Sequence, residues 1–352
     1  MIAPRSRPGA RVWRRHAAYL LGAHTIAYAM ACTEAPQQSN ASRQSRAAIR
    51  ETVASDSMGR PPTDTATVGQ LARADVRESS GVARSTSQSV LFTINDSGNE
   101  PLLYALEVNG ADRGAWRVRG ASNLDWEAIA IGPCATPSGT TQTSVAAGSC
   151  VYIGDVGDNT ARRDTRSIYR VPEPAAEAAG FTGRTPRAEQ LVYRYPDGPR
   201  DVEAMYVASD GAVFLISKRS LRDGNGDRRA ARVYRLSPEA WADGIPVTAQ
   251  LVDSLAIVPG TAPGRQITDA ALSPDGRHVA VRTYSQIFIF ASDPAAGRID
   301  SAVPPEACSL AEFLDVGEGI TWLDSSGTLL LTNEGRGASI YRVKCPLPDA
   351  DP

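Results

Sequence analysis

The sequence predicts an all-β protein, a β-propeller of four-stranded blades, and a repeat is the main observation behind this prediction. A six-residue pattern recurs five times, with a small polar or acidic residue in third place, then a small residue, then mostly apolar ones. The copies are residues 78–83, 125–130, 201–206, 267–272 and 316–321. Repeated units of about 50 residues that each contain four short strands are typical of propeller blades.

The strands of each unit can be assigned in chain order. The six-residue copy is the first strand, and a second apolar strand ending in polar residues follows at 91–96, 151–155, 213–218, 278–283 and 329–333. The third strand is expected at 102–106, 167–171, 232–236, 286–290 and 339–343. A more polar, alternating fourth strand follows in three units, at 115–119, 190–195 and 251–257.

The number of copies predicts five blades, with loop insertions in the longer intervals between them. Six blades, with one degenerate unit between Glu127 and Glu203, and a β-sandwich are the alternatives. The last unit lacks a fourth strand after Val343, and the segment 68–76 could supply it. This pairing of the two ends would remove the open sheet edges of the ring. The predicted propeller therefore spans residues 68–345, followed by a C-terminal tail at 346–352.

The N-terminal segment has the features of an export signal. Residues 1–16 are basic, and residues 17–31 form an apolar run that is too short to span a bilayer and ends in small residues. Cys32 follows at once, as in a bacterial lipoprotein, so we expect a signal peptide at 1–31, acylation of Cys32 and a flexible tether at 32–67. The expected location is the cell envelope, with a lipid anchor as the membrane contact. Ordinary secretion is the alternative.

The charge balance disfavours some classes of partner. Residues 1–31 hold five arginines and no acidic residue, so the remaining chain has 32 basic against 39 acidic side chains. An acidic protein gains no general attraction to nucleic acid or to anionic lipid. After export His278 is the remaining histidine, which argues against a Ser-His-Asp triad. The expected partner is a small anionic ligand or a protein, bound by a monomer.

Four cysteines follow Cys32, and an even number in an oxidising compartment indicates disulfides. Cys134 ends one predicted strand and Cys150 begins the next, so a bridge between them would close the base of a hairpin. That leaves Cys308 to pair with Cys345. Four cysteines allow three pairings, and this one is favoured.

The third position of each copy is a candidate metal ligand. The innermost strand of a propeller blade lines the central channel, so residues at one register converge on the axis. These residues are Ser80, Glu127, Glu203, Asp269 and Glu318. Converging carboxylates repel each other unless something neutralises them, and oxygen donors suit Ca²⁺. The alternative is a water-filled channel whose carboxylates are tied to backbone amides.

The ends of the second strands and the turns after them supply candidate ligand-binding residues around the channel mouth. We expect there Asn95, Asp96, Asp155, Asp158, Lys218, Arg219, Arg282, Tyr284, Asn333 and Arg336. Cations near a bound metal could hold a phosphate or a carboxylate. A solvated rim of salt bridges is the alternative.

Several of these short sequences resemble those of bacterial exported β-propellers, including residues 95–98, 125–130 and 154–159. That group includes the esterase-like phytase family and other calcium-binding propellers. The Ser/Glu/Glu/Asp/Glu ring is also similar to the central site of five-bladed calcium-dependent apyrases, which hydrolyse nucleoside phosphates. No complete catalytic set is visible, so catalytic residues stay unassigned.

Two functions therefore follow as expectations. The first is a lipid-anchored propeller that binds a ligand or partner at its channel mouth, with Ca²⁺ in the ring. The alternative is calcium-assisted hydrolysis of a phosphoester, in which Lys218, Arg282 or Arg336 would bind the phosphate.

Overall fold

The computed structural model describes residues 59–134, 148–218, 230–241, 245–255, 257, 266–310 and 317–348. The expected signal peptide, Cys32, most of the expected tether and Arg219 lie outside these residues. Within the described ranges, no helix is long and apolar enough to cross a membrane.

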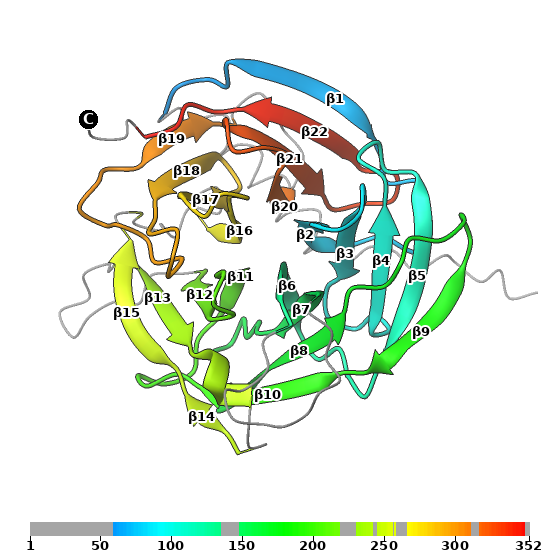
Figure 1. Ribbon diagram of the computed structural model, residues 1–352, viewed down its shortest axis with the longest axis horizontal. Helices are drawn as coiled ribbons and strands as arrows, with labels where there is room; N and C mark the ends of the chain where they lie inside the picture. The colour runs from blue at the N-terminus through cyan, green and yellow to red at the C-terminus, as the bar shows by residue number, and fades with distance from the viewer. Residues whose placement is uncertain are drawn as a thin grey trace, which may run out of the picture. The chain divides into compact units, whose positions relative to one another are not determined.

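The described strands form five sheets arranged around a common axis (Figure 1). Blade 1 contains β2 (Ser79–Arg84), β3 (Leu91–Asn95), β4 (Leu102–Leu106) and β5 (Asp112–Arg119); blade 2 contains β6 (Trp126–Pro133), β7 (Ser149–Asp155), β8 (Arg166–Pro172) and β10 (Glu189–Arg194). Blade 3 contains β11 (Val202–Val207), β12 (Val213–Ser217), β13 (Ala231–Leu236) and β15 (Gln250–Leu255); blade 4 contains β16 (Ile267–Leu272), β17 (His278–Thr283), β18 (Gln286–Ala291) and β19 (Glu306–Ser309). Blade 5 contains β20 (Gly317–Trp322), β21 (Thr328–Asn333), β22 (Ser339–Lys344) and β1 (Asp64–Gln70). The predicted five-bladed propeller of four-stranded blades is confirmed.

The longer intervals between copies contain additional edge strands. β9 (Thr182–Arg187) pairs in parallel with β5, and β14 (Val247–Thr248) pairs in parallel with β10. A short 3₁₀ helix, η1 (Pro238–Trp241), precedes β14. The interval between Glu127 and Glu203, in which a sixth blade was the alternative, therefore contains β9, the fifth strand of blade 1.

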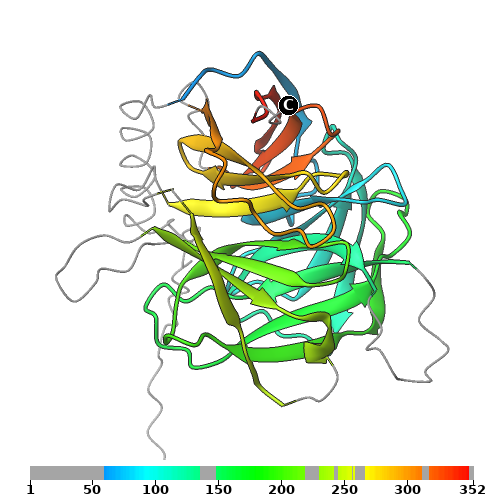
Figure 2. The same cartoon turned by 60° about the vertical axis from the view of Figure 1, so that its left-hand side comes forward.

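The ring is closed by strands from the two ends of the described chain. β1 pairs antiparallel with β22, from Asp64 opposite Lys344 to Gln70 opposite Ser339. Both views place the blue β1 beside the red C-terminal strands (Figures 1 and 2). The closing strand begins at Asp64, earlier than the expected segment 68–76. This closure satisfies the outer edge of β22, which would otherwise expose unpaired backbone groups.

Apolar side chains from neighbouring blades form the core. Met205 packs in a buried cluster with Tyr152 of blade 2, whereas the adjacent Tyr206 packs in a cluster with Phe290 of blade 4. Successive residues of a strand point to opposite faces, so β11 contributes to both of its blade interfaces. Burying each large apolar side chain of this kind contributes roughly 1.5–3 kcal/mol to folding.

Both predicted disulfides are present. Cys134 and Cys150 join β6 and β7 at the base of their hairpin, with Cα atoms 5.1 Å apart. Cys308 of β19 and Cys345, directly after β22, are joined with Cα atoms 5.8 Å apart, which links blade 4 to blade 5. The second disulfide therefore lies beside the strand pair that closes the ring.

Removing the second disulfide should destabilise the fold more than removing the first. In the chain-entropy view, a crosslink stabilises by restricting the unfolded chain, and the sequence separations are 37 and 16 residues. These separations correspond to about 4 and about 3 kcal/mol. The double variant Cys308→Ala/Cys345→Ala should show the lower urea unfolding midpoint, with Cys134→Ala/Cys150→Ala as the matched comparison. An equal or reversed order would contradict the expectation.

Candidate metal centre

Each inner strand carries a position at which its pairing with the second strand is interrupted. In blade 2, Trp126 pairs with Asp155 and Ala128 pairs with Gly154, so Glu127 is left out of the ladder. Blades 3, 4 and 5 each leave out one residue at the same place. In blade 1 the interruption covers Ser80 and Gly81, and Ser80 is the equivalent position. A bulge of this kind re-aims a side chain. We call the five bulge positions the inner ring: Ser80, Glu127, Glu203, Thr268 and Glu318.

The structure corrects one expected ring position by one residue. Asp269 pairs with Arg282, so the residue that the bulge leaves unpaired in blade 4 is Thr268. Asp269 lies one residue further along β16, where its Oδ2 atom accepts hydrogen bonds from the amides of Ile320 at 2.8 Å and Val82 at 3.4 Å. These amides belong to blades 5 and 1, so one carboxylate ties three blades together. Burial raises the pKa of Asp269 well above its usual range, while its amide partners oppose that rise.

The residue that follows each second strand forms another set around the same mouth. In each blade, the first paired residue of the inner strand lies opposite a residue at the end of the second strand, and the residue after that one belongs to this set. In blade 2, for example, Trp126 pairs with Asp155, and Val156 follows. We call them the outer ring: Asp96, Val156, Lys218, Tyr284 and Glu334. Three of the expected ligand-binding residues, Asp96, Lys218 and Tyr284, belong to this ring.

Side chains of the two rings neutralise or bind each other. The Lys218 ammonium forms an ion pair with Glu203 in the same blade. The Tyr284 hydroxyl donates to Glu318 Oε1 at 2.8 Å, from blade 4 to blade 5. These contacts leave each ring glutamate in a different environment.

Burial governs the protonation of this region. Desolvation and then the nearby Glu203 raise the pKa of Glu127, while desolvation followed by Glu334 raises the pKa of Glu318. Burial disfavours the charged form of Lys218, but the surrounding carboxylates, first Glu203, outweigh it and raise the pKa of the Lys218 ammonium. Lys218 is therefore charged at neutral pH and acts as an internal cation among the glutamates.

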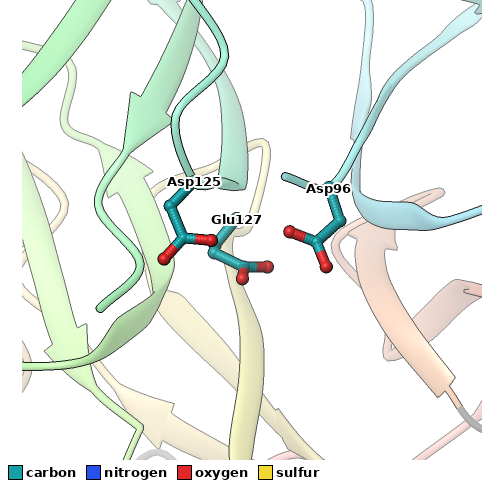
Figure 3. A group of neighbouring side chains, drawn as sticks. All are labelled: Asp96, Asp125 and Glu127. Carbon is teal, nitrogen blue, oxygen red and sulfur yellow. The ribbon is translucent and has the colours of Figure 1, made fainter. Parts of the chain in front are cut away.

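One group of carboxylates has the geometry of a metal centre. Asp96, Asp125 and Glu127 each offer an oxygen, and the three oxygens lie within 4.8 Å of one another. Figure 3 shows Asp96 approaching from blade 1, and Asp125 and Glu127 from the start of blade 2. The Ser80 hydroxyl donates to Glu127 Oε2 at 2.5 Å. Burial, and secondarily the charge of Asp96, raises the pKa of Asp125 to about 6.

A glycine lets the backbone approach these carboxylates. A Cβ atom at Gly157 would lie 2.7 Å from Asp125 Oδ2 and 2.7 Å from Glu127 Cγ. The Gly157 amide also donates to the Asp125 carbonyl at 3.2 Å. The turn after β7 therefore fixes the space in which the two carboxylates lie.

The next blade repeats the Asp-x-Glu sequence as Asp201 and Glu203, with a different outcome. Beside Asp125 and Glu127, the preceding blade contributes Asp96. Beside Asp201 and Glu203, the equivalent residue of the preceding blade is Val156, which offers no ligand, and Lys218 pairs with Glu203. Asp201 Oδ1 accepts from the amide of Asp158 at 3.0 Å, and its Oδ2 has no hydrogen-bond partner among the described residues. Its charge raises the pKa of Asp125 further, after burial and Asp96.

Five of the expected ligand-binding residues are buried inside the propeller instead. Asp155 forms an ion pair with Arg163 of the turn after β7 at 2.6 Å, and Asp158 forms one with Arg166 at the start of β8 at 2.5 Å. Arg282 is 2% exposed and donates to two carbonyls of blade 5, at 2.6 and 2.8 Å. Asn95 and Asn333 are also buried and bind backbone groups. These side chains stabilise the turns that carry the two rings.

Arg336 is exposed in the turn after β21. Sequence reasoning did not assign Asp125 to the metal, although its position two residues before Glu127 is a signal that was available. Its contact with Asp96 depends on how blades 1 and 2 approach each other, which the sequence does not specify.

No protein-family model and no curated protein matches this chain. Among solved structures, it is similar to a gluconolactonase from Xanthomonas campestris, with 18% identity, a TM-score of 0.40, and coverage of 83% of this chain and 87% of that one. It is also similar to the PQQ-bound aldose sugar dehydrogenase from Streptomyces coelicolor, with 11% identity, a TM-score of 0.41, and coverage of 82% and 100%. The allergen Mala s 1 from Malassezia sympodialis shares 10% identity at a TM-score of 0.44, with coverage of 78% and 94%. No activity follows from likenesses at this level.

The metal-free protein should become less stable as the pH rises towards about 8. Burial raises the pKa of Glu203 to about 8 against the opposing effect of the Lys218 ammonium, so between the unfolded pKa and this value the folded state holds a proton that the unfolded state has lost. This contribution is fully present below the unfolded pKa and is lost as the pH rises through the folded pKa. Urea unfolding with a chelator at about pH 5, 6.5 and 8 measures the trend.

Glu203→Gln removes one titrating group and should reduce this pH dependence, while the raised pKa values of Glu127, Glu318 and Asp269 maintain the rest of it. Glu100→Gln, at an exposed side chain, is the matched control and should keep it. A free energy of unfolding that rises over this pH range would show that the sign is wrong.

Proposed function

We propose that this protein is an exported propeller that binds Ca²⁺ at Asp96, Asp125 and Glu127 and, through the ion, an anionic ligand at the channel mouth. The convergence of three carboxylates from two blades within 4.8 Å carries this proposal. The proposed centre keeps Glu127 of the ring expected from the sequence and adds two aspartates outside it.

The donor set favours a hard cation. All three side chains offer carboxylate oxygens, which suit Ca²⁺ better than zinc or copper. Asp201 Oδ2, which has no hydrogen-bond partner in the part of the chain that the structure describes, adds negative charge nearby, and the charge of Asp201 raises the pKa of Asp125. These carboxylates therefore carry an excess of negative charge that a bound cation would relieve. Asp96 and Asp125 are partly exposed, so water or a ligand could complete the coordination sphere.

A bound divalent ion would also change what the mouth attracts. The ion would offset the negative charge of the carboxylates that hold it. A carboxylate or phosphate of the ligand could then occupy the open coordination positions of the ion. Lys218 would add positive charge, although its ammonium is already paired with Glu203. Phosphoester hydrolysis is less well supported, because Arg282 is buried in contact with blade 5 and Lys218 is paired with Glu203, which leaves Arg336 of the three expected phosphate-binding cations.

Titration calorimetry should detect one Ca²⁺ per chain, and Asp125→Asn should weaken binding by about tenfold or more, because a charged ligand is lost. Gly157→Ala should weaken it without any change in charge, since the new methyl group would displace Asp125 and Glu127. Asp275→Asn, at the opposite end of the inner strands, is the matched control and should bind Ca²⁺ normally.

Two results would count against this proposal. Absence of both heat and any calcium-dependent change in melting temperature would remove the metal. Calcium-dependent release of phosphate from an aryl phosphate, lost in Asp125→Asn, would instead establish the hydrolase alternative.

We also propose export with a lipid anchor on Cys32. The two disulfides support an oxidising compartment. In a bacterial host, the full chain should fractionate with membranes, and intact-mass analysis should find acyl chains on Cys32. Cys32→Ser should move the protein to the soluble envelope or the medium, with Cys134→Ser/Cys150→Ser as the control that stays membrane-bound. An unmodified Cys32 thiol in the mature protein would favour simple secretion.

A further inference from the structure

A cavity opens at the end of the inner strands opposite the metal centre. It has a volume of 1090 Å³ and is lined by residues at or beyond the ends of β2, β6, β11, β16 and β20, so all five blades contribute. The metal centre lies at the beginning of these strands. This volume is comparable to that of sites for small molecules, about 300–1,000 Å³.

Along β16, Asp269 lies between the inner-ring position Thr268 and the cavity-lining residue Ala270. It is fully buried, and its bonds to Val82 and Ile320 hold β2 and β20 against β16. Val82 and Ala270 line the cavity, whereas no residue of the inner ring does. The cavity and the metal centre are therefore built from different residues.

One wall of the cavity is a prearranged set of hydroxyl groups. Glu173 accepts hydrogen bonds from the hydroxyls of Ser85, Ser87 and Ser149 and from the Gln88 amide, the last at 3.0 Å. All four donors line the cavity. Because Ser87 and Ser149 give their hydrogens to Glu173, their oxygens remain as acceptors for a ligand. The Ser85 oxygen is not available as an acceptor for a ligand, since it accepts hydrogen bonds from two backbone amides.

The rest of the lining is close to neutral. Its ionised side chains are Arg84, which donates to the Leu323 carbonyl at 2.5 Å, and Asp275, which accepts from Ser273 at 2.6 Å. The charge of Glu173 behind the wall is met by its four donors. The floor is apolar, with Val82 and buried alanines. Arg84 and Asp275 have opposite charges, so the described lining carries no net charge that would favour a charged ligand.

We propose that this cavity binds a neutral saccharide. A sugar ring presents hydroxyl donors along its edge and C–H groups on its face, which match the acceptor wall and the apolar floor. The volume accommodates a short oligosaccharide. This site is independent of Ca²⁺ and of the proposed function at the other mouth.

Saturation-transfer NMR with the intact, oxidised protein tests this proposal, using maltotriose and cellotriose at millimolar concentration. We expect transfer from at least one trisaccharide and none from glucuronate. The double variant Ser87→Ala/Ser149→Ala should weaken binding by about tenfold, since each lost hydrogen bond is worth about 0.5–1.5 kcal/mol. Thr86→Trp, at an exposed lining residue, should block binding sterically without disturbing the Glu173 contacts.

Asp96→Asn provides the control that distinguishes the two mouths. It should weaken Ca²⁺ binding but leave saccharide transfer unchanged, and EDTA should not alter that transfer. The proposal is overturned if neither trisaccharide gives a signal, or if the signal persists in both cavity variants. It is also overturned if the signal disappears with Asp96→Asn, because the sugar would then bind at the metal centre.

Discussion

The mutual repulsion of buried carboxylates near the propeller axis is the constraint on which the site depends. Each of these carboxylates has a different partner. Glu203 pairs with an ammonium, Glu318 accepts from a phenol, and Asp269 accepts from the amides of two other blades. Glu127 accepts from a serine and lies against two further acids. Negative charge is therefore least compensated beside Glu127, so a bound cation would relieve the most electrostatic repulsion there.

The outer ring determines this difference between blades. Its residue in blade 1 is Asp96, in blade 2 Val156 and in blade 3 Lys218. Asp96 adds a ligand to the Asp-x-Glu of the next blade, and Val156 at the same position adds none. Lys218 instead pairs with the glutamate of its own blade. The repeated fold thus provides equivalent positions, and single substitutions in them give each blade its own electrostatic role.

The repeat in the sequence was sufficient to predict the blades, the closure by an N-terminal strand and the pairing of Cys134 with Cys150 and of Cys308 with Cys345. The blades and the Cys134–Cys150 pair depend on patterns within one strand or between consecutive strands. The closure followed from the missing fourth strand of the last unit, and the Cys308–Cys345 pair followed by elimination. Thr268 was missed because the six-residue comparison aligned acids, whereas the bulge is defined by pairing with β17. The burial of Arg282 could not be foreseen either, because it requires Gly317, at which a Cβ atom would overlap the guanidinium.

The carboxylate of Asp269 also connects parts of the chain that are far apart in the sequence. Its amide partners, Val82 of blade 1 and Ile320 of blade 5, lie 187 and 51 residues away from it. Both hydrogen bonds therefore require blades 1 and 5 to lie against blade 4. A change at this one side chain would loosen three blades at once, so the stability of the ring and the alignment of its inner strands are coupled at a single buried group.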